Sequence, residues 1–190
     1  MNKNTGLTTQ QKNLIKEIDE LMKLFNLDYN NAQFYKSETR TIKLRMIKDQ
    51  IIRSEIIMRY LTIDEFLNDI IVNYFFGTKK TYIYLWKTKK FQIFNYWILE
   101  SLGFFQKVNL VNSIKKIPSD ISNNMDRCNK LRNGIVHNLF SENSRSLNKS
   151  KYRGKDIFSI DGMKLFEQDM KRTNSYFMRE RRLFRMLTNI

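Results

Sequence analysis

The sequence is poor in the residues that build cross-links, metal sites and tight turns. Its 190 residues include one cysteine, one histidine, one proline and six glycines. A single cysteine excludes a disulfide scaffold and a cysteine-rich zinc module, and a site of thiolate or imidazole ligands is not expected within one chain. The few glycines and the single proline argue against a β-sandwich with many turns. We predict neither a metal nor another cofactor.

Acidic residues are also few compared with basic ones. The chain has 19 Asp and Glu against 34 Lys and Arg, a formal charge of +15. Such a charge favours a polyanionic partner, because clustered cations attract phosphates; AT-biased codon usage is the alternative explanation for the many lysines. No apolar run approaches the roughly 20 residues of a membrane span, and the N-terminal residues lack the apolar stretch of a signal peptide. We therefore expect a cytoplasmic protein with no membrane contact.

The apolar residues, 42% of the chain, are sufficient for a core and recur at helical spacing. We predict an all-α fold, a single-domain bundle of about five to seven helices with a polar loop or short hairpin before the last one. Residues 1–37 are expected to form an N-terminal amphipathic helix and turn of that same domain. Residues 38–190 are expected to form its main helical part.

The helix bounds follow from apolar spacing and from residues that start or stop helices. The predicted helices cover about residues 9–25, 38–61, 62–76, 91–102, 104–114, 120–140 and 163–187. Thr62 and Glu65 form the capping box that would begin the third, and Gly103 separates the fourth from the fifth. Residues 78–90 are predicted to be an irregular or helical connection, and 152–160 a short hairpin. Seven residues are expected on the buried side of the second helix: Ile42, Met46, Ile47, Ile51, Ile52, Ile56 and Ile57.

The predicted helix 120–140 contains the one group of residues that indicates chemistry. Four apolar residues fall within an arc of about 80° on a helical wheel and form a core stripe: Cys128, Leu131, Ile135 and Leu139. Asn133 and His137, four residues apart, lie on the opposite side, and Arg132 lies at its edge. The only histidine is therefore expected to face water, a loop or another protein.

These three side chains suit the cleavage of a phosphodiester. A histidine can take or give a proton near neutral pH, and an arginine can stabilise the charge that develops on phosphate oxygens. Asn133 can orient the imidazole or bind the ribose or the phosphate. RNA has an internal nucleophile, the 2′-hydroxyl, so this reaction needs no metal.

Acid and base catalysis are two tasks, and each chain has one histidine. Two chains that meet at their histidine faces would supply both groups, and an exposed polar helix face is where such a symmetric contact can form. We therefore expect a homodimer through the Asn133/His137 face of this helix.

The segment LRNGIVHN also resembles a known family signature. Arg132-Asn133-Gly134-Ile135-Val136-His137 is similar to the R-N-x-x-x-H form of the R-x4–6-H motif of HEPN domains, which occur in prokaryotic toxins, abortive-infection systems and CRISPR-associated ribonucleases. The resemblance implies an all-α fold that dimerises around this helix and acts as a metal-independent endoribonuclease. It implies catalytic roles for Arg132 and His137, with Asn133 as a polar helper.

Three further sets of residues invite an assignment. Asp64 and Asp69 are candidates to orient Arg132 or His137, although capping and solvation would also explain the carboxylates there. Five basic residues are candidates for RNA contacts: Lys130, Lys149, Lys151, Arg153 and Lys155. Between residues 78 and 90, lysines interleave with aromatics as in a single-strand binding surface, and buried aromatics beside solvated lysines explain this composition equally well.

The leading hypothesis is a homodimeric endoribonuclease, a toxin or anti-phage effector controlled by an antitoxin or another regulatory protein. The alternative is a non-catalytic helical module that binds RNA or a partner protein through the same face. A DNA-binding protein is disfavoured, because no helix-turn-helix with a basic recognition helix is evident.

Overall fold

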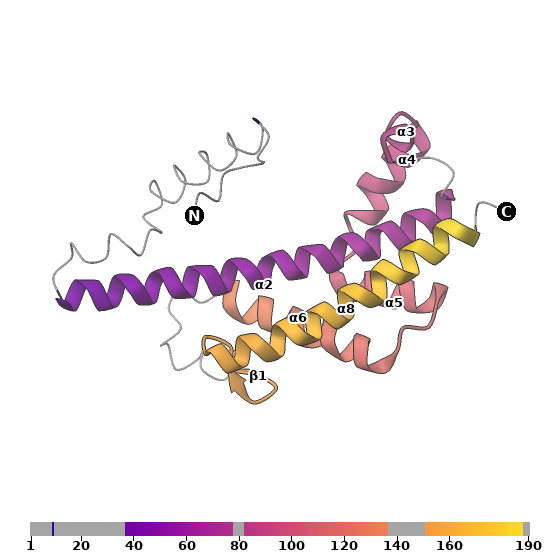
Figure 1. Cartoon of the computed structure of the whole chain (residues 1–190). Helices are drawn as coiled ribbons and strands as arrows, with labels where there is room; N and C mark the ends of the chain where they lie inside the picture. The colour runs from indigo at the N-terminus through magenta and orange to yellow at the C-terminus, as the bar shows by residue number, and fades with distance from the viewer. Residues whose placement is uncertain (1–8, 10–36, 78–81, 137–150, 188–190) are drawn as a thin grey trace. The chain divides into compact units, whose positions relative to one another are not determined.

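The computed structural model describes Thr9 and residues 37–77, 82–136 and 151–187. In these ranges the chain forms six α-helices, one π-helical turn and a two-stranded hairpin (Figure 1), which confirms the predicted all-α fold. The chain divides into two compact units, residues 1–51 and residues 52–190. Apart from Thr9, the predicted helix 9–25 and the turn after it lie outside the described residues.

Helix α2 (Ser37–Phe76) is unbroken, so the predicted helix start at Thr62 is wrong. The Thr62 hydroxyl donates a hydrogen bond to the Met58 carbonyl oxygen, 2.8 Å away, inside the helix and does not cap a new one. Ile56 and Ile63 are both fully buried and lie two turns apart, so one apolar stripe continues through this point. Neither glycine nor proline occurs between Ser37 and Phe76 to interrupt the helix.

The buried stripe of α2 is narrower than predicted. Ile47, Ile52 and Ile56 are buried, whereas Met46 and Ile51 are exposed and Ile57 is half-buried. Ile51 lies about 140° around the helix from Ile56, too far to share one face with it. The side chain of Ile42 is not among those that the structure describes.

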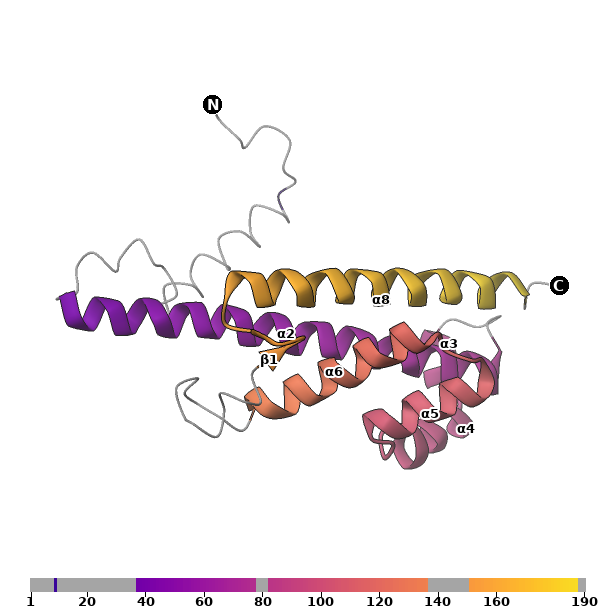
Figure 2. The ribbon, with the colours of Figure 1, turned by 90° about the horizontal axis from the view of Figure 1, so that it is seen from below.

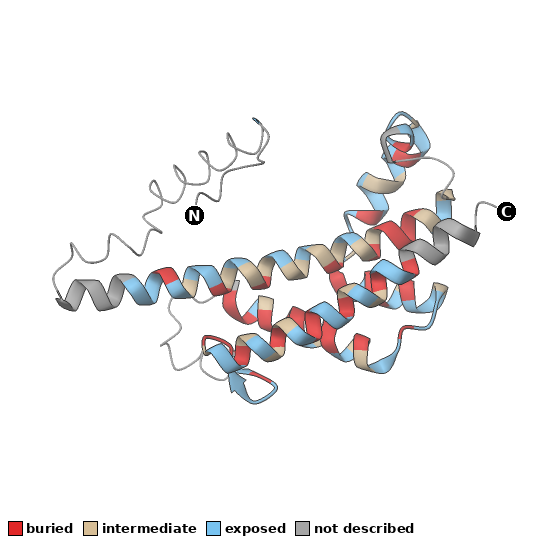
Figure 3. Ribbon diagram, viewed as in Figure 1, coloured by how far each residue is buried: buried red, intermediate tan, exposed pale blue. Residues whose placement is uncertain are grey.

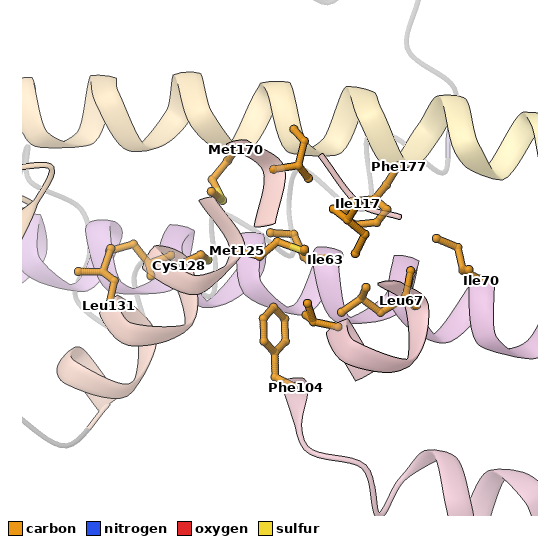
Figure 4. Close-up of a cluster of buried hydrophobic side chains, with 14 of the residues drawn as sticks. Ile63, Leu67, Ile70, Phe104, Ile117, Met125, Cys128, Leu131, Met170 and Phe177 are labelled. Atoms are coloured by element: carbon orange, nitrogen blue, oxygen red, sulfur yellow. The ribbon is translucent and has the colours of Figure 1, made fainter. Parts of the chain in front are cut away.

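Three further helices complete the core of the second unit: α5 (Phe104–Ile114), α6 (Ser119–Val136) and α8 (Ile160–Leu187). Helix α6 runs in the direction opposite to α2 and α8 (Figures 1 and 2), and buried positions line the inward sides of these helices (Figure 3). Ile63 and Leu67 of α2, Met125 of α6 and Met170 of α8 meet in one cluster, which Phe104 of α5 completes (Figure 4).

Polar contacts join the same helices. Arg59 of α2 pairs with Glu167 of α8 at 2.9 Å, and Arg172 of α8 pairs with Asp120 of α6 at 2.7 Å. The Arg53 guanidinium of α2 donates to the backbone carbonyl of Ile135, close to the end of α6. None of the helices in the described ranges combines the length and the apolar character that a membrane crossing requires.

Between α2 and α5 the chain forms short helical pieces: α3 (Tyr82–Trp86), α4 (Lys89–Phe94) and the π-helical turn η2 (Asn95–Leu99). The helical alternative for the 78–90 connection is thus confirmed for residues 82–86. The Thr88 hydroxyl accepts a hydrogen bond from the Phe91 N–H at 3.3 Å, so α4 begins two residues before the predicted helix. In Figure 1, α3 and α4 stand to one side of α6 and α8.

A hairpin precedes α8, and it is shorter than predicted. Strands β1 (Lys151–Tyr152) and β2 (Lys155–Asp156) are antiparallel. Arg153 and Gly154 both have positive φ, 49° and 82°, as a two-residue type I′ turn requires. The predicted extension of the hairpin to residue 160 is wrong, because the Ser159 hydroxyl accepts the Gly162 N–H at 3.1 Å and caps α8.

The hairpin contacts α8 at two points, through a hydrogen bond and through a close backbone approach. The buried Tyr152 hydroxyl donates to Asp169 at 2.9 Å, and burial together with this hydrogen bond raises the pKa of Tyr152. At Gly162 a β-carbon would come within 2.0 Å of the Asp156 carbonyl oxygen. Only glycine therefore lets the first turn of α8 approach the hairpin this closely.

Candidate functional site

Helix α6 buries the described residues of the predicted apolar stripe. Cys128, Leu131 and Ile135 are buried, while Arg132 is half-buried and Asn133 is exposed. Burial raises the pKa of the Cys128 thiol to about 12, so this cysteine stays protonated and carries no reactive thiolate at neutral pH. Helix α6 thus directs Arg132 and Asn133 away from the core.

Two neighbours hold the Arg132 side chain. Its guanidinium carbon lies 5.0 Å from the centre of the Tyr60 ring, a cation–π distance, and its Nη1 atom donates to Asn133 Oδ1 at 2.9 Å. A guanidinium carries five N–H groups. Asn133 takes one of them, and Arg132 has no other hydrogen-bond acceptor among the described residues. Among the described residues, the guanidinium is therefore held by two neighbours and has donors left for an anion.

Tyr60 is the support under this arginine. Its ring stacks on Phe104 of α5, with centroids 4.8 Å apart and an interplanar angle of 28°. Burial and the nearby Asp64 carboxylate raise the pKa of Tyr60, and the Arg132 guanidinium acts in the opposite direction. The phenol therefore stays neutral at physiological pH and presents an uncharged ring to the guanidinium.

Arg132 and Asn133 face an open pocket of about 420 Å³. Its lining comes from three helices: Tyr60 of α2, the α5 start, and Asn129, Arg132 and Asn133 of α6. Gly103 is the N-terminal cap residue of α5, and its N–H donates to Gln106 Oε1 at 2.7 Å. The first turn of a helix presents N–H groups and a partial positive charge. The α5 start and Arg132 therefore both attract an anion to this pocket.

The two carboxylates proposed to orient the site lie on α2. Asp64 pairs with Lys107 of α5 at 2.7 Å, and the two side chains are 21% and 9% exposed. In the described structure the partner of Asp64 is thus this lysine rather than Arg132. Asp69 is a further buried residue of the same helix and does not line the pocket.

The basic residues predicted to contact RNA differ in their surroundings. Lys130 pairs with Asp126 one turn away, at 2.6 Å, and Arg153 pairs with Asp169 at 3.3 Å. Lys151 and Lys155 are exposed on the hairpin strands. Lys149 lies outside the described residues.

His137, the predicted proton-transfer group, also lies outside the described residues. It directly follows Val136, the last residue of α6. The described structure thus brings together Arg132 and Asn133 but does not place the histidine. Within the described ranges, no three acidic, cysteine or histidine side chains are grouped so that they could hold a metal ion.

Comparison with family models, with curated proteins and with solved structures finds no match for this chain. The geometry of the site and the motif around Arg132 are therefore the features that bear on function.

Tyr60, Asn129 and the start of α5 belong to the pocket but were not predicted from the sequence. One signal was present for Tyr60, since it is an aromatic residue with a hydroxyl beside the apolar stripe of α2. Its contact with Arg132, however, joins residues far apart in the chain. Neither helical periodicity nor a local motif reveals such a contact.

Proposed function

We propose that the protein is a metal-independent endoribonuclease of the HEPN type that acts as a homodimer. The observation that carries the proposal is Arg132, held between Tyr60 and Asn133 at an open pocket beside the start of α5. An arginine with its flat face supported and its edge available matches the oxygens of a phosphate. The resemblance of residues 131–138 to the HEPN motif gives this phosphate site its reaction.

In the proposed reaction, His137 removes the proton of a ribose 2′-hydroxyl. The 2′-oxygen attacks the phosphorus, and the bond from phosphorus to the 5′-oxygen breaks. The partner's His137 gives a proton to the departing 5′-oxygen, so the products are a 2′,3′-cyclic phosphate and a 5′-hydroxyl. Arg132 stabilises the charge on the phosphate oxygens during this step, and Asn133 holds Arg132 through its side-chain oxygen.

The biological role follows from this activity. We further propose that the protein acts on RNA in the cytoplasm, where uncontrolled cleavage would stop growth. We therefore propose a toxin or anti-phage effector that a regulatory protein holds in check. A growth assay with wild type and His137→Ala tests the role separately from the chemistry.

The deciding experiment measures cleavage of a defined single-stranded RNA by wild type, Arg132→Ala and His137→Ala. Both variants should lose cleavage while keeping the free energy of unfolding within about 1 kcal/mol of wild type, since neither side chain belongs to the apolar stripe. Arg132→Ala should also bind RNA more weakly, whereas His137→Ala should still bind RNA without cutting it. Arg127→Ala, which removes the same charge from the same helix, is the matched control and should retain activity.

Three further results test the mechanism. Cleavage should persist in EDTA, the products should end in a 2′,3′-cyclic phosphate, and light scattering at tens of micromolar should give a dimer. Equal cleavage by wild type and His137→Ala would instead favour the alternative function, a helical module that binds RNA or a partner protein without cutting. Loss of activity in EDTA with recovery on adding a divalent ion would contradict the proposed chemistry.

A further inference from the structure

The stretch from residue 70 to residue 99 has a composition unlike the rest of the chain. It contains ten aromatic residues, five lysines and both tryptophans, Trp86 and Trp97, but no aspartate or glutamate. Three of its lysines, Lys87, Lys89 and Lys90, lie in the described segment from α3 to η2, and no acidic residue of the stretch is present to neutralise them.

Four large aromatic side chains of these helices are exposed to solvent instead of being buried in the core. Trp86 is 47% exposed and Trp97 is 71% exposed, and Tyr84 and Tyr96 are exposed as well. Tryptophan is highly buried on average in folded proteins, and a group of exposed apolar side chains marks an interaction site. The alternative in which the aromatics between residues 78 and 90 are buried beside solvated lysines is thus wrong for Tyr84 and Trp86.

Neighbouring aromatic rings support Trp86. A series of ring contacts, with centroids 5.0–5.4 Å apart, runs through six aromatic residues: Tyr74, Phe75, Phe94, Phe76, Phe91 and Trp86. Phe91 is fully buried, and the Trp86 ring packs against it in a T-shaped contact. A second pair, Tyr96 and Trp97, is in contact at 5.3 Å. A planar ligand that stacks on Trp86 therefore meets a ring that is packed against the core.

Lysines lie beside these rings. Lys87 Nζ lies 5.5 Å from the centre of the Tyr84 ring, and Lys90 Nζ lies 5.7 Å from the centre of the Phe76 ring. Lys89 is exposed in α4, which runs directly into η2 with Tyr96 and Trp97. Flat rings with cations beside them match the bases and the phosphates of a nucleic acid strand.

We infer that α3, α4 and η2 form a platform for unpaired RNA, with bases stacked on Trp86 and Trp97 and with Lys87, Lys89 and Lys90 along the phosphates. The inference rests on the proposed function and deepens it, because it names single-stranded RNA as the substrate class. A duplex would not fit, since its base faces are already stacked within the helix. A symmetric contact with a second copy would bring the same lysines together, and lysine is depleted at protein interfaces.

The test measures binding of labelled 2′-O-methyl oligouridylate, which the proposed mechanism cannot cleave, to the full chain. Fluorescence anisotropy reports affinity. Tryptophan fluorescence reports the platform directly, because both tryptophans of the chain lie in it. Wild type should bind, its tryptophan emission should be quenched, and a duplex of equal length should bind more weakly.

Trp97→Ala and Trp86→Ala should each weaken binding by about tenfold, and Trp97→Phe should recover most of the loss. Lys89→Gln/Lys90→Gln should weaken binding and lower its salt dependence. The control variant Lys164→Gln/Lys171→Gln removes the same charge from α8 and should leave both the affinity and its salt dependence unchanged. Trp86 contacts the buried Phe91, so circular dichroism checks that Trp86→Ala still folds. The tests with the Trp97 and lysine variants remain valid even if Trp86→Ala does not fold.

Several outcomes would overturn the platform. Unchanged oligouridylate affinity in Trp97→Ala and in Lys89→Gln/Lys90→Gln would do so. Quenching by anionic phosphatidylserine vesicles but not by the oligonucleotide would indicate a membrane surface. Self-association that Trp97→Ala abolishes, with RNA affinity intact, would indicate a contact between copies. Failure of the proposed function would give another result: wild type would bind the oligonucleotide and its tryptophan emission would be quenched, but it would cleave no RNA.

Discussion

Helix α6 and the α3–η2 segment use their apolar side chains in opposite ways. In α6, the apolar residues Met125, Cys128 and Leu131 are buried in the core, and its exposed positions carry polar side chains such as Asn133. In the α3–η2 segment, Leu85, Phe91 and Leu99 are buried, while four aromatic side chains, both tryptophans among them, are exposed. An apolar residue of α6 therefore contributes chiefly to folding, and most of the large aromatic residues of the other segment remain available for binding.

The contrast also separates two steps of the proposed activity. Arg132 on α6 is a single, well-held cation beside a pocket, which suits the stabilisation of one reacting phosphate. The α3–η2 segment offers several rings and several cations, which suits a length of substrate whose sequence matters little. Substitutions in the two regions should thus alter turnover and affinity to different extents.

The largest effect should come from the buried side of α6. Leu131→Ala removes a side chain that is 2% exposed and should lower the free energy of unfolding by about 2–5 kcal/mol through the cavity it leaves. Urea unfolding followed by circular dichroism measures this loss. A change below about 1 kcal/mol would mean that α6 is not packed in solution as described, and the contrast between the two regions would disappear.

A smaller effect should appear at alkaline pH. An unfolded cysteine titrates near pH 8.5, whereas burial raises the pKa of Cys128 to about 12. Between these values the native chain holds a proton that the unfolded chain has lost, so stability is complete below about pH 8 and falls by at most about 1.4 kcal/mol per pH unit above it. Urea unfolding between pH 7 and pH 10 should show this decline in wild type.

Cys128→Ala is the control for that measurement, because it removes the titrating thiol. Its stability should depend less on pH over the same range, whatever its stability at pH 7. Parallel curves for the two proteins would show that the thiol is accessible to water in the native state, contrary to its burial on α6.

The smallest effect should come from the exposed rings. Trp97→Ala removes a side chain that is 71% exposed and should change the free energy of unfolding by less than about 0.5 kcal/mol. The same urea titration used for Leu131→Ala measures it. A loss as large as that of Leu131→Ala would show that Trp97 is covered in solution, and the two regions would then not differ in kind.

Local sequence patterns were enough to predict part of the fold. The repeat of Cys128, Leu131 and Ile135 placed the buried side of α6 correctly, and Gly103 marked the break before α5. The start predicted at Thr62 failed, because a threonine hydroxyl can bond either the first turn of a new helix or the preceding turn of its own. Only the packing of the stripe on both sides of Thr62 decides between these two arrangements.

The candidate site was predictable only in its α6 component. Arg132 and Asn133 follow from the motif and from the helical wheel. Tyr60 and the start of α5 reach the same pocket through tertiary packing, as the stacking of Tyr60 on Phe104 shows. Likewise, composition alone left open whether the Trp86 side chain is buried or exposed, since aromatic residues between lysines are compatible with both.

The contact between Gly162 and the hairpin has a consequence for sequence variation. The Asp156 carbonyl oxygen occupies the space that any side chain at residue 162 would need, and this oxygen belongs to the backbone, which no substitution at residue 156 removes. A compensating second mutation is therefore not readily available. In a library that samples every amino acid at each position, selection for folded protein should leave residue 162 almost invariant while Trp97 drifts freely. Glycine at this point in an otherwise divergent chain would then serve as a marker for finding relatives.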